Sequence, residues 1–247
     1  MKKSVCFFML YYKRHELTKM SMWHMSNVIQ FFNQQGVEAK GIIVGDEQPI
    51  MDYAEELGLE HYECKNDPLS EKFNFAIEKA VDQGMDYICW LGSNNFSQIG
   101  YWEKALTHLK NNESVSFGTT RFVVVDRNPN KQSTYLFKTR KTIHLCSHGQ
   151  FYKTSAMKGI GFGSESVFNK NKSKDFDGSL NKLLTYKHGG VAVKNITVGE
   201  YDCFDIKDIS ENINSYESYN GYPKGKSRDE IFDKYEELQL LKQGYFK

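Results

Sequence analysis

The chain contains few cysteines, and their spacing excludes two common uses of the residue. The five cysteines are an odd number at wide spacing, with no C-x-x-C pair and no histidine at metal-ligand spacing. This pattern argues against a disulfide framework and against a zinc site built on cysteine pairs. Three of them lie in apolar runs, where a free thiol behaves as a small hydrophobe. We therefore expect a reducing, cytoplasmic setting.

Long hydrophobic runs are also lacking. No segment approaches the ~20 apolar residues that a membrane span needs, so no membrane insertion is expected. The start MKKSVCFFMLYYKRHE imitates a signal peptide, because two lysines precede an apolar stretch. However, the charged residues 13–16 follow at once and no small-residue cleavage site is present. A buried first strand is the better interpretation.

The chain has almost no net charge, but its charges are unevenly distributed. Thirty-two Lys and Arg against thirty-one Asp and Glu give +1, which excludes a polycation that coats nucleic acid. Between Arg121 and Lys174, eleven basic residues accompany only Asp126 and Glu165, an excess of nine that leaves −8 for the rest. This region either faces anions or is a solvated basic surface.

The first hundred residues alternate between strand and helix patterns. Apolar runs at 4–12, 37–45, 59–64 and 85–91 are separated by helical patterns at 16–35, 49–57 and 69–83, most of them closed by glycine. Repeated βαβ units produce a mostly parallel sheet. We therefore predict an α/β class with a Rossmann-like sheet and helices on both faces.

The second half has a different rhythm. Short β-rich segments between residues 114 and 155 add antiparallel strands, followed by a helix at 177–187 and a strand at 191–198. The chain ends in an amphipathic helix with Ile231, Tyr235, Leu238 and Leu241 on one stripe, which we expect to pack on the body of the protein. We predict one domain over 1–200 and a C-terminal extension over 201–247.

Candidate site residues follow the predicted strands, where ligands bind in parallel α/β sheets. The sequence has no Walker loop, G-x-G-x-x-G, G-x-S-x-G or H-E-x-x-H motif. Asp46 either addresses a base or ribose or caps the next helix. Lys72 and Asn74 lie in the first turns of a helix, where a lysine is usually just solvated. The turn Gly92–Asn95, GSNN, ends the fourth strand.

Aromatic and histidine residues near these ends have two interpretations each. Tyr11, Tyr12, Arg14 and Trp90 stack on or clamp a uracil-type base, or the rings belong to the core. His144 and His148 are spaced i, i+4 but fall in a strand-to-turn segment rather than a helix. We interpret the two histidines as polar surface residues.

The order of these motifs resembles that of nucleotide-sugar glycosyltransferases of the A-type fold. The segments are VGDE (44–47), NDPLSEKFNFAIEKA (66–80), DYICWLGSNN (86–95) and KDFDGSLNKLL (174–184). They look most like small family-2-like enzymes, including those of bacteriophages, and the likeness covers about residues 4–200. The resemblance implies a nucleotide-sugar half at 1–110 and an acceptor half at 111–200.

The resemblance also implies roles for individual residues. Asp46 matches the acid that contacts the nucleobase or ribose, and Lys72 with Asn74 matches a K-x-N that holds the nucleotide. Ser93, Asn94 and Asn95 match the turn written G-S-D-D, which ligates Mn²⁺ or Mg²⁺ on the diphosphate. Here both acids are asparagine, a weaker ligand for a hard cation. Metal use is therefore in doubt, and Asn95 is the remaining candidate ligand.

The catalytic base implied by the resemblance lies in the segment KDFD. Asp175 matches the acid that deprotonates the acceptor hydroxyl, with Asp177 as helix N-cap; the reverse assignment and a capping role for both are the alternatives. Glu165, in the glycine-rich loop GIGFGSES, is the third candidate.

The favoured hypothesis is an inverting glycosyltransferase that uses a nucleoside-diphosphate sugar, with UDP as the expected nucleotide. The basic region suggests a polyanionic acceptor, and we favour hydroxymethylated pyrimidine in phage DNA, modified in the host cytoplasm. The alternatives are a cell-surface glycan acceptor and an inactive nucleotide-sugar-binding relative. A nucleotidyltransferase is disfavoured because YYKRHE lacks the glycine of its loop. The sequence does not determine the oligomeric state.

Overall fold

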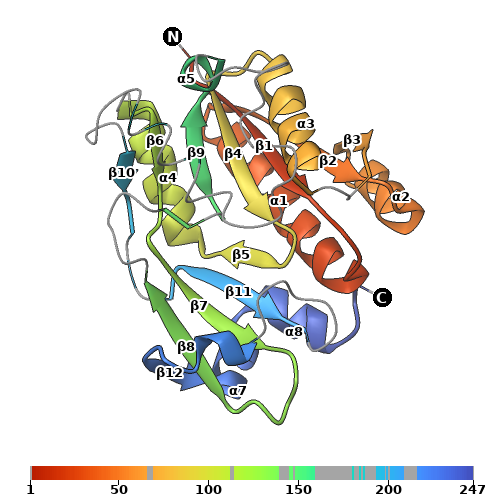
Figure 1. Ribbon diagram of the computed structural model, residues 1–247, viewed down its shortest axis with the longest axis vertical. Coiled ribbons are helices and arrows are strands. Elements are labelled where there is room, and N and C mark those ends of the chain that lie inside the picture. Colours follow the sequence, from red (N-terminus) through yellow and green to blue (C-terminus); the bar gives the residue numbers. More distant parts are fainter. Residues whose placement is uncertain are drawn as a thin grey trace.

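The architecture consists of two β-sheets surrounded by helices (Figure 1). The computed structural model describes residues 2–65, 69–111, 114–138, 145–146, 148–158, 180, 184, 186, 193–197, 199, 201–208 and 216–246. A seven-stranded sheet holds the first part of the chain, and a five-stranded sheet lies beside it.

Four parallel strands form the centre of the seven-stranded sheet, in the order β4-β1-β2-β3. They are β1 (Ser4–Leu10), β2 (Glu38–Gly45), β3 (Glu60–Glu63) and β4 (Tyr87–Gly92). Beyond β4 lies β9 (Gln150–Lys153), which pairs antiparallel with β4. The next strand, β6 (Ser116–Gly118), pairs antiparallel with β9, and β10 (Val193–Asn195) pairs parallel with β6 at the edge. The predicted α/β class, with a mostly parallel sheet extended by antiparallel strands, is confirmed.

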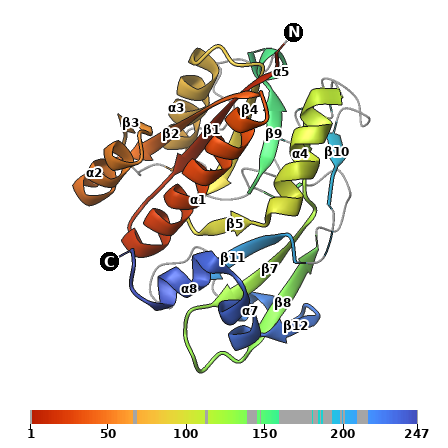
Figure 2. The same ribbon diagram turned by 180° about the vertical axis from the view of Figure 1, so that it is seen from behind.

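Helices cover both faces of this sheet because the side chains of β1 alternate between two apolar clusters. Phe7 and Met9 pack with α1 (His15–Gln34), α2 (Gln48–Glu56) and α4 (Ile99–Asn111). Phe8 and Leu10 pack on the opposite face with α3 (Leu69–Asp82) and α5 (Thr154–Lys158). Figure 2 shows α1 and α4 lying across the first of these faces. A strand buried on both faces needs the continuous apolar sequence that β1 has.

The five-stranded sheet has the order β12-β8-β7-β11-β5. Its strands are β5 (Asn95–Ser97), β7 (Arg121–Asp126), β8 (Ser133–Lys138), β11 (Cys203–Lys207) and β12 (Lys224–Ser227). The sequence predicted β7 and β8 but not the other three, which are short and partly polar. Strand β11 comes from residues 201–247 and lies between β7 and β5, so the C-terminal extension supplies an inner strand of this sheet.

The C-terminal helix is divided in two. The sequence predicted one amphipathic helix, whereas the structure has α7 (Arg228–Lys234) and α8 (Glu236–Lys242), separated at Tyr235 by an extended backbone with φ −109° and ψ 129°. The prediction of a single helix is therefore wrong. All four residues of the predicted stripe are nevertheless buried, against Leu17 of α1 and the second sheet. The break lets the Tyr235 ring contact Phe204, with 4.7 Å between ring centroids.

Several predicted elements lie partly outside the described residues. In the predicted helix at 177–187, Leu180 and Leu184 are helical, and both are buried in the apolar cluster that contains residues of α3 and α5. Among the β-rich segments predicted between residues 114 and 155, TIHL (142–145) falls outside the described residues except for Leu145, which is buried and belongs to no helix or strand. A turn of 3₁₀ helix, η2 (Tyr216–Tyr219), covers the face of the second sheet opposite α7. No helix in the described part of the chain is long and apolar enough to cross a membrane.

Candidate functional site

The candidate site lies where β1, β2 and β4 end, and a strained loop forms its first wall. Lys13 and Arg14, between β1 and α1, have φ of 53° and 51°, a left-handed conformation that is costly outside glycine. The Glu47 carboxylate holds this loop: it accepts from the Lys13 backbone N–H at 2.6 Å and lies 2.5 Å from His15 Nε2. The sequence did not single out Glu47, although it stands in VGDE beside Asp46.

In this loop the side chain of Arg14 extends to the turn after β4. Its Nη2 donates a hydrogen bond to Ser93 Oγ at 3.2 Å, which joins the end of β1 to the turn after β4. A guanidinium next to a tight turn is a suitable partner for an anionic group. The structure therefore brings Arg14 and Ser93, both predicted site residues, into contact.

Tyr11 and Lys72 are buried residues that hold the end of β1 in place beside the candidate site. The Tyr11 ring is buried against Gly45, its hydroxyl accepts from the Glu47 N–H at 3.2 Å, and burial raises the pKa of the phenol to about 12. Lys72 is fully buried, burial lowers the pKa of its ammonium, and Nζ donates to the Tyr11 carbonyl. These contacts fix the end of β1, so Tyr11 presents no free ring face for stacking on a base.

The two asparagines of the GSNN turn bind the second sheet. Asn94 Nδ2 donates to Asp205 Oδ1 at 2.7 Å and to the Ile206 carbonyl at 2.8 Å. Asn95 Nδ2 donates to the Phe204 carbonyl at 3.1 Å. Both amide nitrogens therefore point into β11 and tie the turn to that strand.

Asp205 and Lys207 form an ion pair beside this turn. Lys207 Nζ lies 2.8 Å from Asp205 Oδ2, and the two residues are 6% and 8% exposed. Lys207 also lies over the Tyr219 ring, 5.4 Å from its centroid. The sequence reasoning missed both residues. Their signal is the alternation of apolar and charged residues in CFDIK, which is typical of a half-buried strand.

The described residues around the turn do not fit a divalent cation. Asn94 and Asn95 direct their amide nitrogens to β11 and offer only neutral oxygens, and both oxygens of Asp205 already accept, one from Asn94 and one from Lys207. An ammonium on the nearest carboxylate repels a second cation. In the part of the chain that the structure describes, no group of three or more His, Cys, Asp or Glu side chains has a metal-binding arrangement.

The remaining predicted site residues are dispersed or undescribed. Asp46 and Tyr12 are exposed at the ends of β2 and β1, and Asn74 is half-buried on α3. Glu165, Asp175 and Asp177 lie outside the described residues.

Trp90 and His148 have core roles. The Trp90 and Phe73 rings pack edge to face, with 4.6 Å between their centroids, so Trp90 belongs to the core. His148 is 4% exposed, which makes the prediction of a surface histidine wrong: its Nδ1 accepts from the Gly92 N–H at 3.3 Å, and burial holds its pKa well below the usual 6.5. His144 lies outside the described residues.

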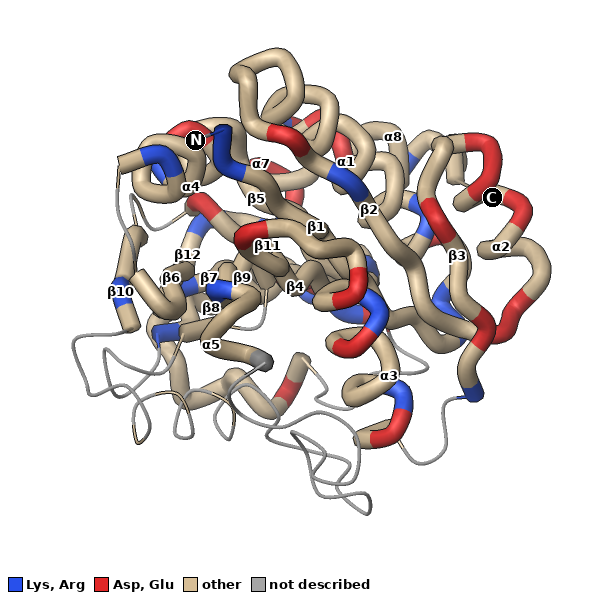
Figure 3. Tube along the Cα trace, turned by 90° about the horizontal axis from the view of Figure 1, so that it is seen from above, with Lys and Arg blue, Asp and Glu red and all other residues tan. Residues whose placement is uncertain are grey.

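The basic segment 121–174 is only partly available to a ligand. Arg127 pairs with Glu16 at 2.6 Å and Asp208 at 3.0 Å, and Lys131 pairs with Glu217 at 2.7 Å. Figure 3 shows acidic segments grouped along α2 and β3, and basic ones along β10 and near β7 and β9.

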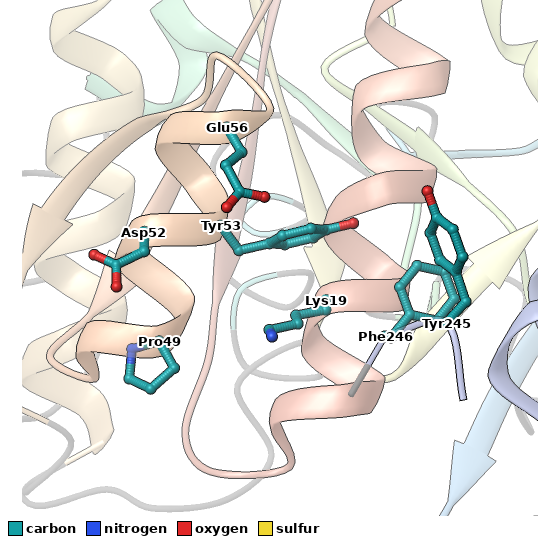
Figure 4. Close-up of a pocket in the computed structure, with 7 residues that line it drawn as sticks. All are labelled: Lys19, Pro49, Asp52, Tyr53, Glu56, Tyr245 and Phe246. Atoms are coloured by element: carbon teal, nitrogen blue, oxygen red, sulfur yellow. The ribbon is translucent and has the colours of Figure 1, made fainter.

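A separate pocket of about 500 Å³ lies between α1, α2 and the C-terminal residues (Figure 4). Tyr53 extends from α2 toward Tyr245 and Phe246, and Lys19 of α1 closes the side. None of the predicted site residues lines this pocket. It is therefore distinct from the site at the strand ends.

Comparison with known proteins finds likeness in structure alone. No protein-family model matches the chain, and no curated protein matches it in sequence. A crystal structure of S. aureus TarS 1-349 superposes with a TM-score of 0.53 at 13% identity, covering 83% of this chain and 60% of that one. The mannosyltransferase PcManGT from Pyrobaculum calidifontis, in complex with GDP-Man and Mn²⁺, gives 0.54 at 7% identity, covering 89% and 60%.

A third neighbour, mannosyl-3-phosphoglycerate synthase from Rubrobacter xylanophilus, gives a TM-score of 0.52 at 10% identity, covering 85% of this chain and 68% of that one. The chain thus spans about 60% of the length of the first two structures. Its fold is similar to that of GT-A glycosyltransferase structures, which is the fold that the sequence resemblance implied.

Proposed function

We propose that the protein is a glycosyltransferase that moves a sugar from a nucleoside-diphosphate sugar to an acceptor hydroxyl. The observation that carries this proposal is the network from Arg14 through Ser93 and Asn94 to Asp205, which joins the carboxyl ends of β1 and β4 to β11. Ligands of open α/β sheets bind beyond such ends. A solved structure with a similar fold holds GDP-Man.

In this proposal the donor lies across the ends of β1, β2 and β4. The exposed Asp46 carboxylate accepts hydrogen bonds from the base or ribose, as the resemblance implies, and Asn74 assists it. Arg14, held toward Ser93, binds a phosphate oxygen of the diphosphate. Lys72 acts indirectly by fixing the Tyr11 carbonyl. We take UDP as the nucleotide, as the sequence resemblance suggests.

The chemical step that we propose is a single displacement with inversion. The acceptor oxygen attacks the anomeric carbon, and the bond from that carbon to the diphosphate oxygen breaks. The electron pair of this bond leaves with the nucleoside diphosphate, and the acceptor proton passes to Asp175. Asp177 and Glu165 are the alternative bases.

We propose hydroxymethylated pyrimidine in duplex DNA as the acceptor, within the cytoplasm of a phage-infected host. The support is the excess of nine positive charges between residues 121 and 174. Phosphate neutralisation dominates DNA affinity, and the target base must be reached or flipped out of the stack. Arg127 and Lys131 are already paired with acids, so other basic residues of this segment must supply the contacts.

Donor binding is tested by thermal shift and calorimetry with UDP-, GDP- and dTDP-sugars. Asp46→Asn should weaken binding of the preferred donor about tenfold, the loss of one hydrogen bond to a charged group. Asp52→Asn is the matched control, because it also replaces one aspartate by asparagine, but on α2, where Asp52 lines the separate pocket. If Asp52→Asn weakens binding and Asp46→Asn does not, the donor occupies that pocket instead. No binding of any donor would refute the proposal.

Transfer is tested with a labelled donor and duplex DNA that carries 5-hydroxymethylcytosine, against the same duplex with cytosine. Transfer only to the hydroxymethylated duplex supports the DNA acceptor, whereas transfer to a glycan and not to DNA favours the alternative acceptor. Asp175→Asn should abolish transfer and leave donor binding unchanged. Donor binding without transfer or hydrolysis in the unmodified chain would identify a binding-only relative.

A further inference from the structure

A buried lysine of the second sheet, Lys207, lies close to the GSNN turn, the segment that resembles a metal-binding turn. Lys207 reaches the turn through Asp205, whose two oxygens contact Lys207 and Asn94 at 2.8 Å and 2.7 Å. The backbone repeats this link, because the Ile206 N–H donates to the Asn94 carbonyl at 2.9 Å. Strand β11 is therefore fixed against the turn on both sides of Asp205.

We propose that the Lys207 ammonium, held by Asp205, binds the diphosphate of the donor, and that this protein binds nucleoside diphosphates without a divalent cation. The inference rests on the proposed function and assigns the diphosphate subsite within it. Arg14, which donates a hydrogen bond to Ser93 of the same turn, supplies the second cation.

A balance of charge supports the assignment. A G-S-D-D turn with a divalent cation has two carboxylates and two positive charges, which sum to zero. Here the two asparagines are neutral, and the Asp205–Lys207 pair also sums to zero. The loss of both turn carboxylates thus coincides with a lysine and its own carboxylate on the adjacent strand, so the local net charge is the same without an ion.

The geometry leaves Lys207 able to donate to a ligand. An ammonium carries three N–H donors, and in the described structure its contacts are one oxygen of Asp205 and the face of the Tyr219 ring. The carboxylate and the ring hold Nζ in one position, which reduces the entropy that a flexible lysine loses on binding.

The test measures the affinity of UDP, GDP, dTDP and CDP by calorimetry, with EDTA and with Mn²⁺. We expect the Kd of the nucleotide that binds best to agree within about threefold in the two conditions. Because Lys207→Met alone leaves the Asp205 charge buried and unpaired, the main variant is Asp205→Asn/Lys207→Met, which keeps the local charge at zero. It should weaken binding in EDTA at least roughly tenfold, the value of one charge-assisted hydrogen bond.

Lys226→Met is the matched control, since Lys226, on the edge strand β12 of the same sheet, forms an ion pair with Glu230 of α7. It should leave the nucleotide affinity unchanged. Circular dichroism and thermal melting verify that each variant is folded.

The outcomes separate this inference from the function on which it rests. Nucleotide binding that disappears in EDTA and returns with Mn²⁺ in the unmodified chain overturns the inference alone. An unchanged affinity of Asp205→Asn/Lys207→Met in EDTA also overturns it. If none of the four nucleotides binds with or without Mn²⁺, the proposed function fails, and the inference fails with it.

Discussion

The amide nitrogen of Asn94 lies 2.7 Å from Oδ1 of Asp205, a residue 111 positions later in the chain. This hydrogen bond joins the turn after β4 to an inner strand of the second sheet. Both residues are buried, so an amide donor facing a carboxylate is the arrangement that leaves neither group unsatisfied. The identity of the residue at position 94 therefore affects the stability of both sheets.

Asn94→Asp should destabilise the protein strongly, because it places a second carboxylate against Asp205 and removes the donor. We expect the free energy of unfolding to fall by about 3 kcal/mol, the scale of a buried unpaired charge. Urea denaturation at neutral pH measures the change.

The exchanged pair Asn94→Asp/Asp205→Asn serves as the control for this variant. It restores the contact between an amide and a carboxylate, but it also removes the carboxylate that pairs with Lys207 and the donor to the Ile206 carbonyl, so only part of the lost stability should return. A double variant that is as unstable as the sum of the two single variants would contradict this account of the hydrogen bond.

Gly92→Ala should destabilise the protein through a steric clash within the GSNN turn. A Cβ at Gly92 would overlap Asn95 Oδ1, and the Asn95 amide is held by the Phe204 carbonyl. We expect a loss of roughly 1–3 kcal/mol, the usual cost of overpacking. Gly100→Ala, on α4 with open space around the new Cβ, should instead stabilise by about 0.5 kcal/mol because alanine is the better helix residue. Equal effects of the two substitutions in thermal unfolding would exclude the steric explanation.

Glu47→Ala should release the loop that carries Arg14. The variant loses the hydrogen bond to the Lys13 N–H and the contact with His15, while the left-handed backbone at Lys13 and Arg14 keeps its strain. We expect a loss of about 1–2 kcal/mol in urea and a several-fold weaker nucleotide affinity.

Two further variants distinguish loop strain from a general loss of charge. Glu55→Ala, on the exposed side of α2, should change stability by less than about 0.5 kcal/mol. Lys13→Gly in the Glu47→Ala background should recover part of the stability, since glycine adopts a positive φ readily. Without this recovery, strain in the loop is not the cause.

Stability should decrease as the pH falls below about 6.5, in part because of His148. Burial, and then the nearby His24, hold the pKa of His148 well below the 6.5 expected of the unfolded chain. At a pH between these two values the unfolded state binds the proton and the folded state does not, so acid favours unfolding. One such group adds a slope of up to about 1.4 kcal/mol per pH unit.

His148→Asn should reduce this slope, because an asparagine oxygen can accept the Gly92 N–H without titrating. Part of the slope should remain, since burial also lowers the pKa values of His61 and His108. Urea unfolding of both proteins between pH 7.5 and about pH 5 gives the two slopes. Equal slopes would mean that His148 titrates normally in the folded protein.

The local pattern of the sequence was sufficient for the first sheet. In β1 every residue from Val5 to Leu10 faces one of two apolar layers, so this unbroken run of apolar residues identifies a central strand without knowledge of its neighbours. The same reasoning predicted where the candidate site lies, because parallel strands place their carboxyl ends at one edge. Arg14, Ser93 and Asn94, each predicted from its position after a strand, do lie in one network.

The second sheet could not be predicted in this way. Strand β5 has three residues, and β12 consists of Lys, Gly, Lys and Ser, so neither has an apolar pattern of its own. Their pairing depends on β11 and β8, which come from distant parts of the chain. Likewise, the break at Tyr235, whose ring packs on Phe204, had no signal in the spacing of apolar residues, which favoured a continuous helix.

The sequence by itself determined the alternation of strands and helices, and with it the edge of the sheet at which the parallel strands end, because both follow from hydrophobic periodicity within short segments. Only the tertiary structure decided what the asparagines of the GSNN turn do. Asn94 faces Asp205, and Asp205 faces Lys207, because the register of β11 on β5 and β7 brings these residues together. A contact across 111 residues depends on sheet pairing, which no local pattern specifies.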